Sequence, residues 1–169
     1  MMCQFTRHLA VCCAAFGLVA ASSVNALTLV VADNAITGIT GLEIAEQRYD
    51  VRFTDGAFNA VYPAAWSGYG PLARQVAQAL LAATATLQAA PNWNATLRPR
   101  GCQSADSCTV LIPEQADAAA PHARMMQAVE AIYSADRFST VPDPLWPFDA
   151  ATDTQYMPDM LYAIITPSR

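Results

Sequence analysis

The stretch RYDVRFTDG, residues 48–56, has the clearest periodicity in the chain. Tyr49, Val51 and Phe53 alternate with the charged or polar residues at 48, 50, 52 and 54. Successive side chains of a strand point to opposite faces, so the pattern predicts a strand with one buried and one solvent-exposed face. We expect the charges on the exposed face to form cross-strand pairs. Asp55 and Gly56 end the strand.

Two shorter strands are predicted before this one. Residues 27–31 form a β-favouring run that ends at residues 32–34. Residues 36–44 are interrupted by Gly38 and Gly41, a pattern typical of an edge or bulged strand. Residues 45–47 form a turn that joins this strand to RYDVRFTDG as a hairpin.

A helix is predicted over residues 71–90, because Pro71 suits a first helical position and apolar residues recur every three or four positions. This stripe comprises Leu72, Val76, Leu80, Ala83 and Leu87. A strand at Thr109–Ile112 follows and is closed by Pro113. A second helix is predicted from about residue 118 or 121 to Ser134, with Met125 and Met126 as gap-filling core residues.

Residues 137–159 contain four prolines and no period, so we expect a long loop there, functional or mobile. The run MLYAIITPS, residues 160–168, predicts a last strand. Together these segments predict one α+β domain over residues 27–169, a small antiparallel sheet of about five strands with two helices packed on one face.

The N-terminus has the features of a secretory signal peptide. Arg7 and His8 precede an apolar run from Leu9 to Ala21, and small residues follow up to Ala26. The run is about 13 residues, shorter than the roughly 20 that cross a bilayer. We therefore expect cleavage after Ala26, a periplasmic or extracellular location, and no membrane attachment afterwards.

The cysteines divide at the same position. Three of the five, Cys3, Cys12 and Cys13, lie in the predicted leader, so only Cys102 and Cys108 remain in the domain. A redox site favours Cys-x-x-Cys at a helix start, and a structural zinc ion needs four ligands. The domain has neither pattern, and two cysteines in an oxidising compartment predict a disulfide.

Charge argues against nucleic acid as a partner. The chain has 9 basic and 14 acidic residues, a net charge of −5, and its arginines form no cluster. Nucleic-acid affinity comes mainly from neutralised phosphates, so neither nucleic acid nor an anionic membrane surface is expected to bind. A cell-envelope glycan or protein is compatible with the charge.

Three segments resemble a group of small secreted bacterial proteins that often carry a PEP-CTERM sorting tail. The segments are RYDVRFTDG, GCQSADSCTVLIP and the terminal YAIITP. The group shares a Tyr-Asp-Val-x-Phe-x-Asp-Gly strand and a later cysteine pair. This chain has Ala57 and Phe58 where relatives place a cysteine, and it ends in ITPSR without the sorting tail. The resemblance implies an exported domain and no particular activity.

The candidate catalytic groups are sparse. His122 is the single histidine outside the leader, and a general base also needs a nucleophile and an orienting carboxylate. The carboxylates of the long loop are Asp143, Asp149, Asp153 and Asp159. A hydrolase using His122 with these carboxylates is one hypothesis, and a calcium site formed by the aspartates is another, although no ligand spacing supports it. We expect no catalytic set, metal or cofactor.

Loop aromatics provide a binding hypothesis. Tyr62, Trp66 and Tyr69 lie in a Gly/Pro-rich segment, and Trp146 lies in another. Flat rings on loops can stack on sugars or anchor a protein, but they can equally pack onto the core. The sequence therefore predicts an exported, disulfide-linked, non-enzymatic domain of structural or interaction type. The more specific hypothesis is a carbohydrate- or protein-binding module that uses these aromatic residues.

Overall fold

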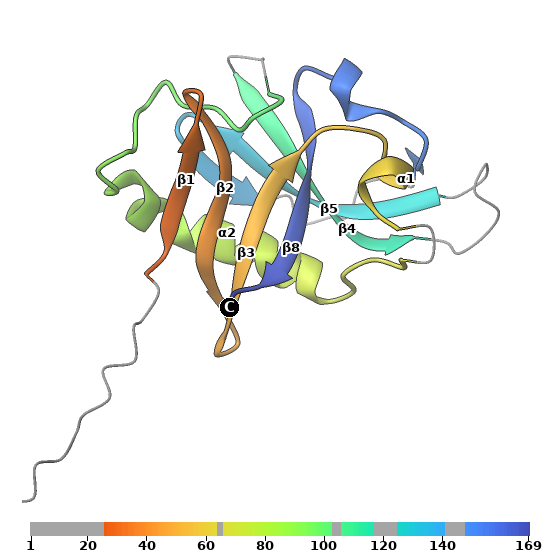
Figure 1. Cartoon of the computed structure of the whole chain (residues 1–169), viewed down its shortest axis with the longest axis horizontal. Coiled ribbons are helices and arrows are strands. Elements are labelled where there is room, and N and C mark those ends of the chain that lie inside the picture. The colour runs from red at the N-terminus through yellow and green to blue at the C-terminus, as the bar shows by residue number, and fades with distance from the viewer. Residues whose placement is uncertain (1–25, 64–65, 103–105, 117–124, 141–147) are drawn as a thin grey trace, which may run out of the picture.

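The computed structural model describes residues 26–63, 66–102, 106–116, 125–140 and 148–169. The helical elements are α1 (Phe58–Val61), α2 (Leu72–Gln88) and the 3-10 turn η1 (Thr154–Tyr156). The strands are β1 (Thr28–Ala32), β2 (Ala35–Ile44), β3 (Gln47–Thr54), β4 (Ser107–Ala116), β5 (Met125–Ser134), β6 (Arg137–Thr140), β7 (Phe148–Asp149) and β8 (Met160–Pro167). Figure 1 shows their arrangement.

The strands form one curled, mixed sheet in the order β1-β2-β3-β8-β4-β5-β6, and β7 pairs with the start of β5. All pairings are antiparallel except that of β4 with β8, which is parallel. The β3 to β8 register runs from Tyr49 opposite Pro167 to Thr54 opposite Tyr162. The last strand of the chain therefore lies in the middle of the sheet (Figure 1).

The main core lies between α2 and one face of this sheet. The predicted stripe is confirmed, because Val76, Leu80, Ala83 and Leu87 are buried and Leu72 packs against the same cluster. The helix contacts β2, β4, β5 and β6, and Figure 1 shows it crossing behind the sheet. One helix is enough to cover this face because the sheet curls around it.

The predicted fold class is wrong. The described residues form mostly sheet, with seven strands in one continuous path and a single long helix, where about five strands and two helices were expected. The sheet is mixed where an antiparallel one was expected, since β4 and β8 run parallel.

The second predicted helix is a strand, β5. Val129, Ala131 and Tyr133 pack into the main core, while Met126 and Ala128 belong to a second core on the opposite face. Because both faces are buried, the strand has no alternation of apolar and polar residues, and its sequence imitates a helical stripe. Met126 is fully buried, as expected of a core methionine.

The opening stretch forms β3 as predicted. Val51 and Phe53 are buried in the main core, and Tyr49 packs against it. Ala45 and Glu46, with φ of 48° and 65°, form the turn between β2 and β3. The register of β2 shifts between Ile39 and Leu42, so β2 is bulged, and it is an interior strand.

Two predicted boundaries also change. Pro113 lies inside β4, at a register shift between Pro113 and Gln115, where a proline that cannot donate a hydrogen bond is tolerated. The predicted loop 137–159 contains β6, β7 and η1 in its described parts. A turn at Ala135–Asp136 starts β6, with φ of 48° and 65°.

The predicted disulfide between Cys102 and Cys108 is present, with a Cα separation of 5.5 Å. Both cysteines are buried in the main core. The bond connects β4 to the segment before it. That segment is hydrogen-bonded to β2, because Ile36 N donates to Arg98 O at 2.9 Å and Arg100 N donates to Ile36 O at 2.8 Å.

Candidate functional site

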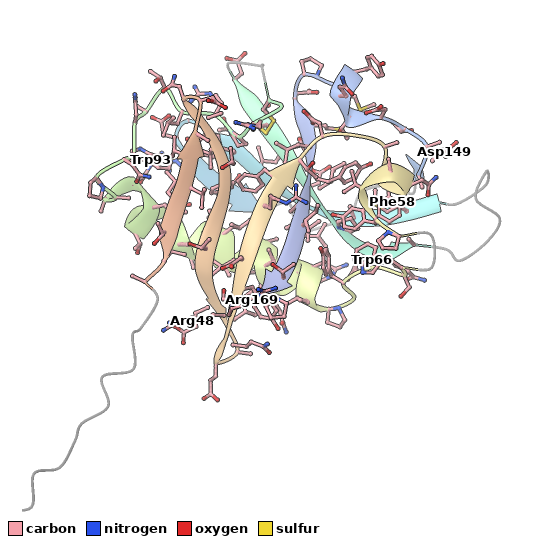
Figure 2. All side chains as sticks on the ribbon, viewed as in Figure 1. Arg48, Phe58, Trp66, Trp93, Asp149 and Arg169 are labelled. Carbon is pink, nitrogen blue, oxygen red and sulfur yellow. A yellow bond between two sulfur atoms is a disulfide. The ribbon has the colours of Figure 1, made fainter. Side chains whose placement is uncertain are left out.

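The predicted loop aromatics come together in a second core, on the sheet face away from α2. Phe58, Tyr62, Leu111, Met126 and Tyr162 are among its buried members, and Trp66 and Tyr69 pack against them. Figure 2 shows Phe58 and Trp66 beside α1. Trp146 and His122 lie outside the described residues.

The rings of this cluster cover one another. Tyr62 and Trp66 are stacked, with centroids 4.3 Å apart and planes 9° apart. Phe58 lies 4.8 Å from Tyr62 and 5.8 Å from Trp66, and Tyr69 meets Trp66 edge-on at 4.7 Å. Aromatic pairs in these geometries stabilise a core. One face of Tyr62 and one face of Trp66 are therefore occupied by each other.

The phenol groups of the cluster bind the backbone of β8. Tyr62 Oη donates to Ala163 O at 2.7 Å, and Ile165 N donates to Tyr69 Oη at 2.7 Å. These two backbone groups lie just past the last parallel pair, Leu111 with Tyr162, where β4 and β8 separate. Segment 67–70 follows β4 there, with Tyr69 N donating to Pro113 O at 3.0 Å. Tyr62 and Tyr69 therefore close a split in the sheet.

Burial explains the ionisation of these tyrosines. It raises the pKa of Tyr62 far above the ordinary range, and the nearby phenols of Tyr69 and Tyr162 raise it further. The pKa of Tyr69 is also raised by burial. Both phenols therefore remain neutral hydrogen-bonding groups at physiological pH.

The other half of the same sheet face is open. The second core covers β4, β5 and part of β8, whereas β1, β2, β3 and the end of β8 carry outward side chains that no described element covers. A hollow of about 600 Å³ on these strands is lined by Thr40, Asp50, Arg52, Thr54, Ile164 and Thr166, among others. We call the hollow defined by these six residues the open-face furrow.

The open-face furrow also includes a second hollow that adjoins the first. This second hollow, of about 790 Å³, shares Thr40, Asp50 and Thr166 with the first and extends to Ser168 and Arg169. Figure 2 shows Arg169 just after the end of β8, near the N-terminal end of β3. The opposite end of the furrow reaches Asp55 and Arg100. The two hollows together follow the strands, which is a shape suited to an extended ligand.

Most charged groups of the furrow are engaged internally. Asp50 Oδ1 accepts hydrogen bonds from Gly41 N at 3.0 Å and Ser168 Oγ at 2.6 Å. Arg100 forms an ion pair with Asp33 at 2.7 Å. Arg52 differs, because its exposed guanidinium forms no hydrogen bond or ion pair with any residue of the described ranges. The predicted cross-strand charge pairs of β3 are therefore absent at Arg52.

Asp55, at one end of the furrow, is partly buried. Its Oδ1 accepts a hydrogen bond from Thr154 Oγ1 at 3.3 Å, and its carboxylate lies against Gly101. Burial raises the pKa of Asp55 above the usual 3.8, the Thr154 hydrogen bond lowers it, and the nearby Asp153 raises it. The net effect is a raised pKa for Asp55.

This shift makes stability depend on pH in a defined direction. Because the folded state holds the Asp55 proton more tightly than the unfolded state, the stabilisation is present at low pH and is lost as pH rises through the folded pKa. We expect the stability of the wild type, relative to Asp55→Asn, to fall as the pH rises from below the ordinary pKa of 3.8 through the raised pKa of the folded state. Urea unfolding across that range measures it. A difference that stays flat would contradict the raised pKa.

Asp50 and Asp55 do not form a hydrolytic pair, whereas Asp55 and Asp153 lie close enough to interact electrostatically, and Asp143 lies outside the described residues. Asp50 and Asp55 are five residues apart on an extended chain, about 16 Å between Cα atoms, whereas glycosidase carboxyl groups lie roughly 5 to 9.5 Å apart. Asp149 and Asp153 accept hydrogen bonds from Ala151 N and Gln155 N, at 2.8 and 2.9 Å, in their own turns. In the described ranges, no group of three or more His, Cys, Asp or Glu side chains gathers for a metal ion.

No protein-family model, curated protein or solved structure matches the chain at a significant level. The resemblance to PEP-CTERM-associated proteins therefore stays a prediction, as does export. Within the part of the chain that the structure describes, no helix has the length and apolar character to cross a membrane.

Sequence reasoning proposed none of the furrow residues as ligand-binding, although it placed one wall of the furrow on the exposed face of β3. The alternation in β3 placed Arg52 on the exposed face, but nothing near it in the sequence indicates that it has no partner. The other walls of the furrow come from β2 and β8, and Thr166 lies more than 100 residues along the chain from Arg52. Only the β3 to β8 pairing brings them together.

Proposed function

We propose that the chain is an exported, disulfide-linked binding domain that holds an extended ligand in the open-face furrow. The observation that carries the proposal is the difference between the two halves of one sheet face. One half is closed by residues 57–63 and 66–70 with their aromatic rings, and the other is hollowed and carries polar and charged side chains among apolar ones.

Export is supported by the leader and by the disulfide. The first strand begins at Thr28, two residues after the expected cleavage site, so cleavage removes none of the described elements. A buried disulfide is typical of proteins that fold in an oxidising compartment.

Binding is favoured over hydrolysis by the groups that line the furrow. Its hydroxyls and its guanidinium can hold polar groups of a ligand, and its two carboxylates are hydrogen-bonded within the protein. A concave site with a few convergent polar groups is the usual form of a binding site.

Export is tested by expressing the full chain in a bacterial host and sequencing the N-terminus of the recovered protein. We expect a protein that begins at Leu27, lies outside the cytoplasm and contains no free thiol. An Ala26→Asp variant, which places a charged residue at the cleavage site, should accumulate uncleaved. Recovery of the wild type from the cytosol, uncleaved and with free thiols, would contradict export.

The binding face is tested with two matched variants and a panel of soluble polysaccharides. Thr166→Trp fills the exposed side of the furrow, and Gln78→Trp places the same ring on the exposed side of α2. For any polysaccharide that binds the wild type, we expect Thr166→Trp to lower the affinity at least tenfold and Gln78→Trp to leave it within twofold. Equal effects of both variants would place binding elsewhere.

A further inference from the structure

The surroundings of Arg52 form a notch in the furrow. The register places Arg52 between Gly38 on β2 and Ile164 on β8. A Cβ added at Gly38 would overlap the carbonyl oxygen of Val51, so this position accepts no side chain without a shift of the backbone. On its β2 side Arg52 faces a residue without a side chain, and on its β8 side a partly buried apolar neighbour, Ile164. The phenols of Tyr62 and Tyr69 lie close enough to interact with the guanidinium electrostatically.

The guanidinium offers donors that the protein does not use. Arg has five N–H groups in a planar fork that matches a carboxylate. The nearest carboxylate on the same strand face, Asp50, already accepts two internal hydrogen bonds. Asp50 and Arg52 are two residues apart on β3, which separates their Cα atoms by about 7 Å. Asp50 attracts Arg52 but accepts no hydrogen bond from its N–H groups. A ligand carboxylate would supply the missing acceptors.

The groups beside Arg52 suit a hydroxyl-rich ligand. Thr40 and Thr166 carry hydroxyls with no hydrogen-bond partner among the described residues, and a hydroxyl both donates and accepts. Phe53 lines the furrow through its backbone, because its side chain is buried in the main core. With no aromatic ring exposed along the furrow as described, the stacking that holds neutral sugars is not offered. The interactions that the furrow offers are an ion pair with Arg52 and hydrogen bonds to hydroxyl groups.

A peptide strand fits less well. β2, β3 and β8 have neighbours on both sides, so their backbone groups are paired beneath the furrow. Strand addition needs a free sheet edge. A ligand lying in the furrow must therefore be recognised by side chains, which favours a chain whose own polar groups are hydroxyls and carboxylates.

We propose that the furrow binds an acidic polysaccharide, with a uronic-acid carboxylate held by Arg52 and sugar hydroxyls held by Thr40 and Thr166. This is one local ion pair, unlike the many phosphate contacts of nucleic-acid binding that the negative net charge disfavours. This inference rests on the proposed function, because it names the ligand class of the same furrow. It requires that the affinity depend on the guanidinium fork and on the charge of the sugar.

The test is calorimetric titration of the folded domain with oligogalacturonate. We expect Arg52→Ala to lower the affinity at least tenfold. Arg52→Lys keeps the charge but loses the planar fork, so an intermediate loss is expected. Arg137→Ala removes an exposed arginine from β6, outside the furrow, and should stay within twofold of the wild type. Because Arg52 is exposed and forms no hydrogen bond or ion pair in the described ranges, the melting temperature of Arg52→Ala should stay close to that of the wild type.

Two further ligands separate the alternatives. Methyl-esterified oligogalacturonate has the same hydroxyls without charge and should bind at least tenfold more weakly. Oligoglutamate supplies carboxylates on a peptide and should also bind weakly. Equal binding of the ester, equal binding of oligoglutamate, or no binding of oligogalacturonate at millimolar concentration would overturn the inference.

The proposed function can survive that failure. If a neutral polysaccharide such as dextran binds and Thr166→Trp abolishes its binding while Arg52→Ala does not, the furrow is the binding face and the ligand class is wrong. If Thr166→Trp leaves the binding of every polysaccharide unchanged, both proposals fail.

Discussion

Phe58→Ala is expected to lower the free energy of unfolding by about 3 to 5 kcal/mol, the usual cost of truncating a fully buried phenylalanine. Phe58 is 0% exposed and lies beneath the stacked pair of Tyr62 and Trp66. It also meets Tyr162 edge-on, with centroids 6.1 Å apart. The variant leaves a cavity under the segment that closes the split between β4 and β8, so that segment should loosen as well.

Urea unfolding monitored by tryptophan fluorescence measures the effect, and an emission shift from Trp66 in the folded state would report the loosening. Leu81→Ala is a suitable control, because Leu81 is 44% exposed on α2 and its truncation should cost about 0.5 kcal/mol or less. A loss below about 1 kcal/mol for Phe58→Ala would contradict the second core as a stabilising unit.

Replacing both cysteines by alanine is expected to cost about 2 to 2.5 kcal/mol. This is the loop-entropy value for the short ring that the Cys102–Cys108 bond closes. Alanine is preferred to serine, because Cys108 is fully buried and a serine there would add a buried hydroxyl. For a domain of this size the melting temperature should fall by about 4 to 10 °C.

Thermal unfolding of the wild type in a reducing agent provides the matched comparison. We expect reduction to produce about the same loss as the double alanine variant, and no further loss when the variant itself is reduced. A wild type whose melting temperature is unchanged by complete reduction would show that the bond contributes nothing to stability. The segment that pairs with Ile36 would then be held by its hydrogen bonds alone.

Sequence reasoning correctly predicted the elements that have one buried and one solvent-exposed face. β3 and α2 each show a strong period, because one side of each element packs into the main core and the other faces solvent. β5 has no such contrast. Met126 and Ala128 are buried on one of its faces, and Val129 and Tyr133 on the other, so its apolar residues carried no reliable period.

The turns show a similar limit. Ala45–Glu46 and Ala135–Asp136 both have positive φ angles without glycine or asparagine. The first was predicted because a clear strand follows it, and the second was missed because β6 is only four residues long. The residue types at Ala135–Asp136 are not characteristic enough of a turn to predict it without a clear strand beside it.

The sequence by itself determined which side of RYDVRFTDG is buried, where the long helix lies and which two cysteines can pair, because each depends on neighbours within a few residues or on a count. Three features follow from the tertiary structure alone: β8 lies between β3 and β4, Tyr62 and Tyr69 close the split beside it, and Arg52 faces an open furrow with no hydrogen bond or ion pair in the described ranges. These features arise from pairing between segments about 100 residues apart, and local periodicity specifies the face of a strand but not its neighbour.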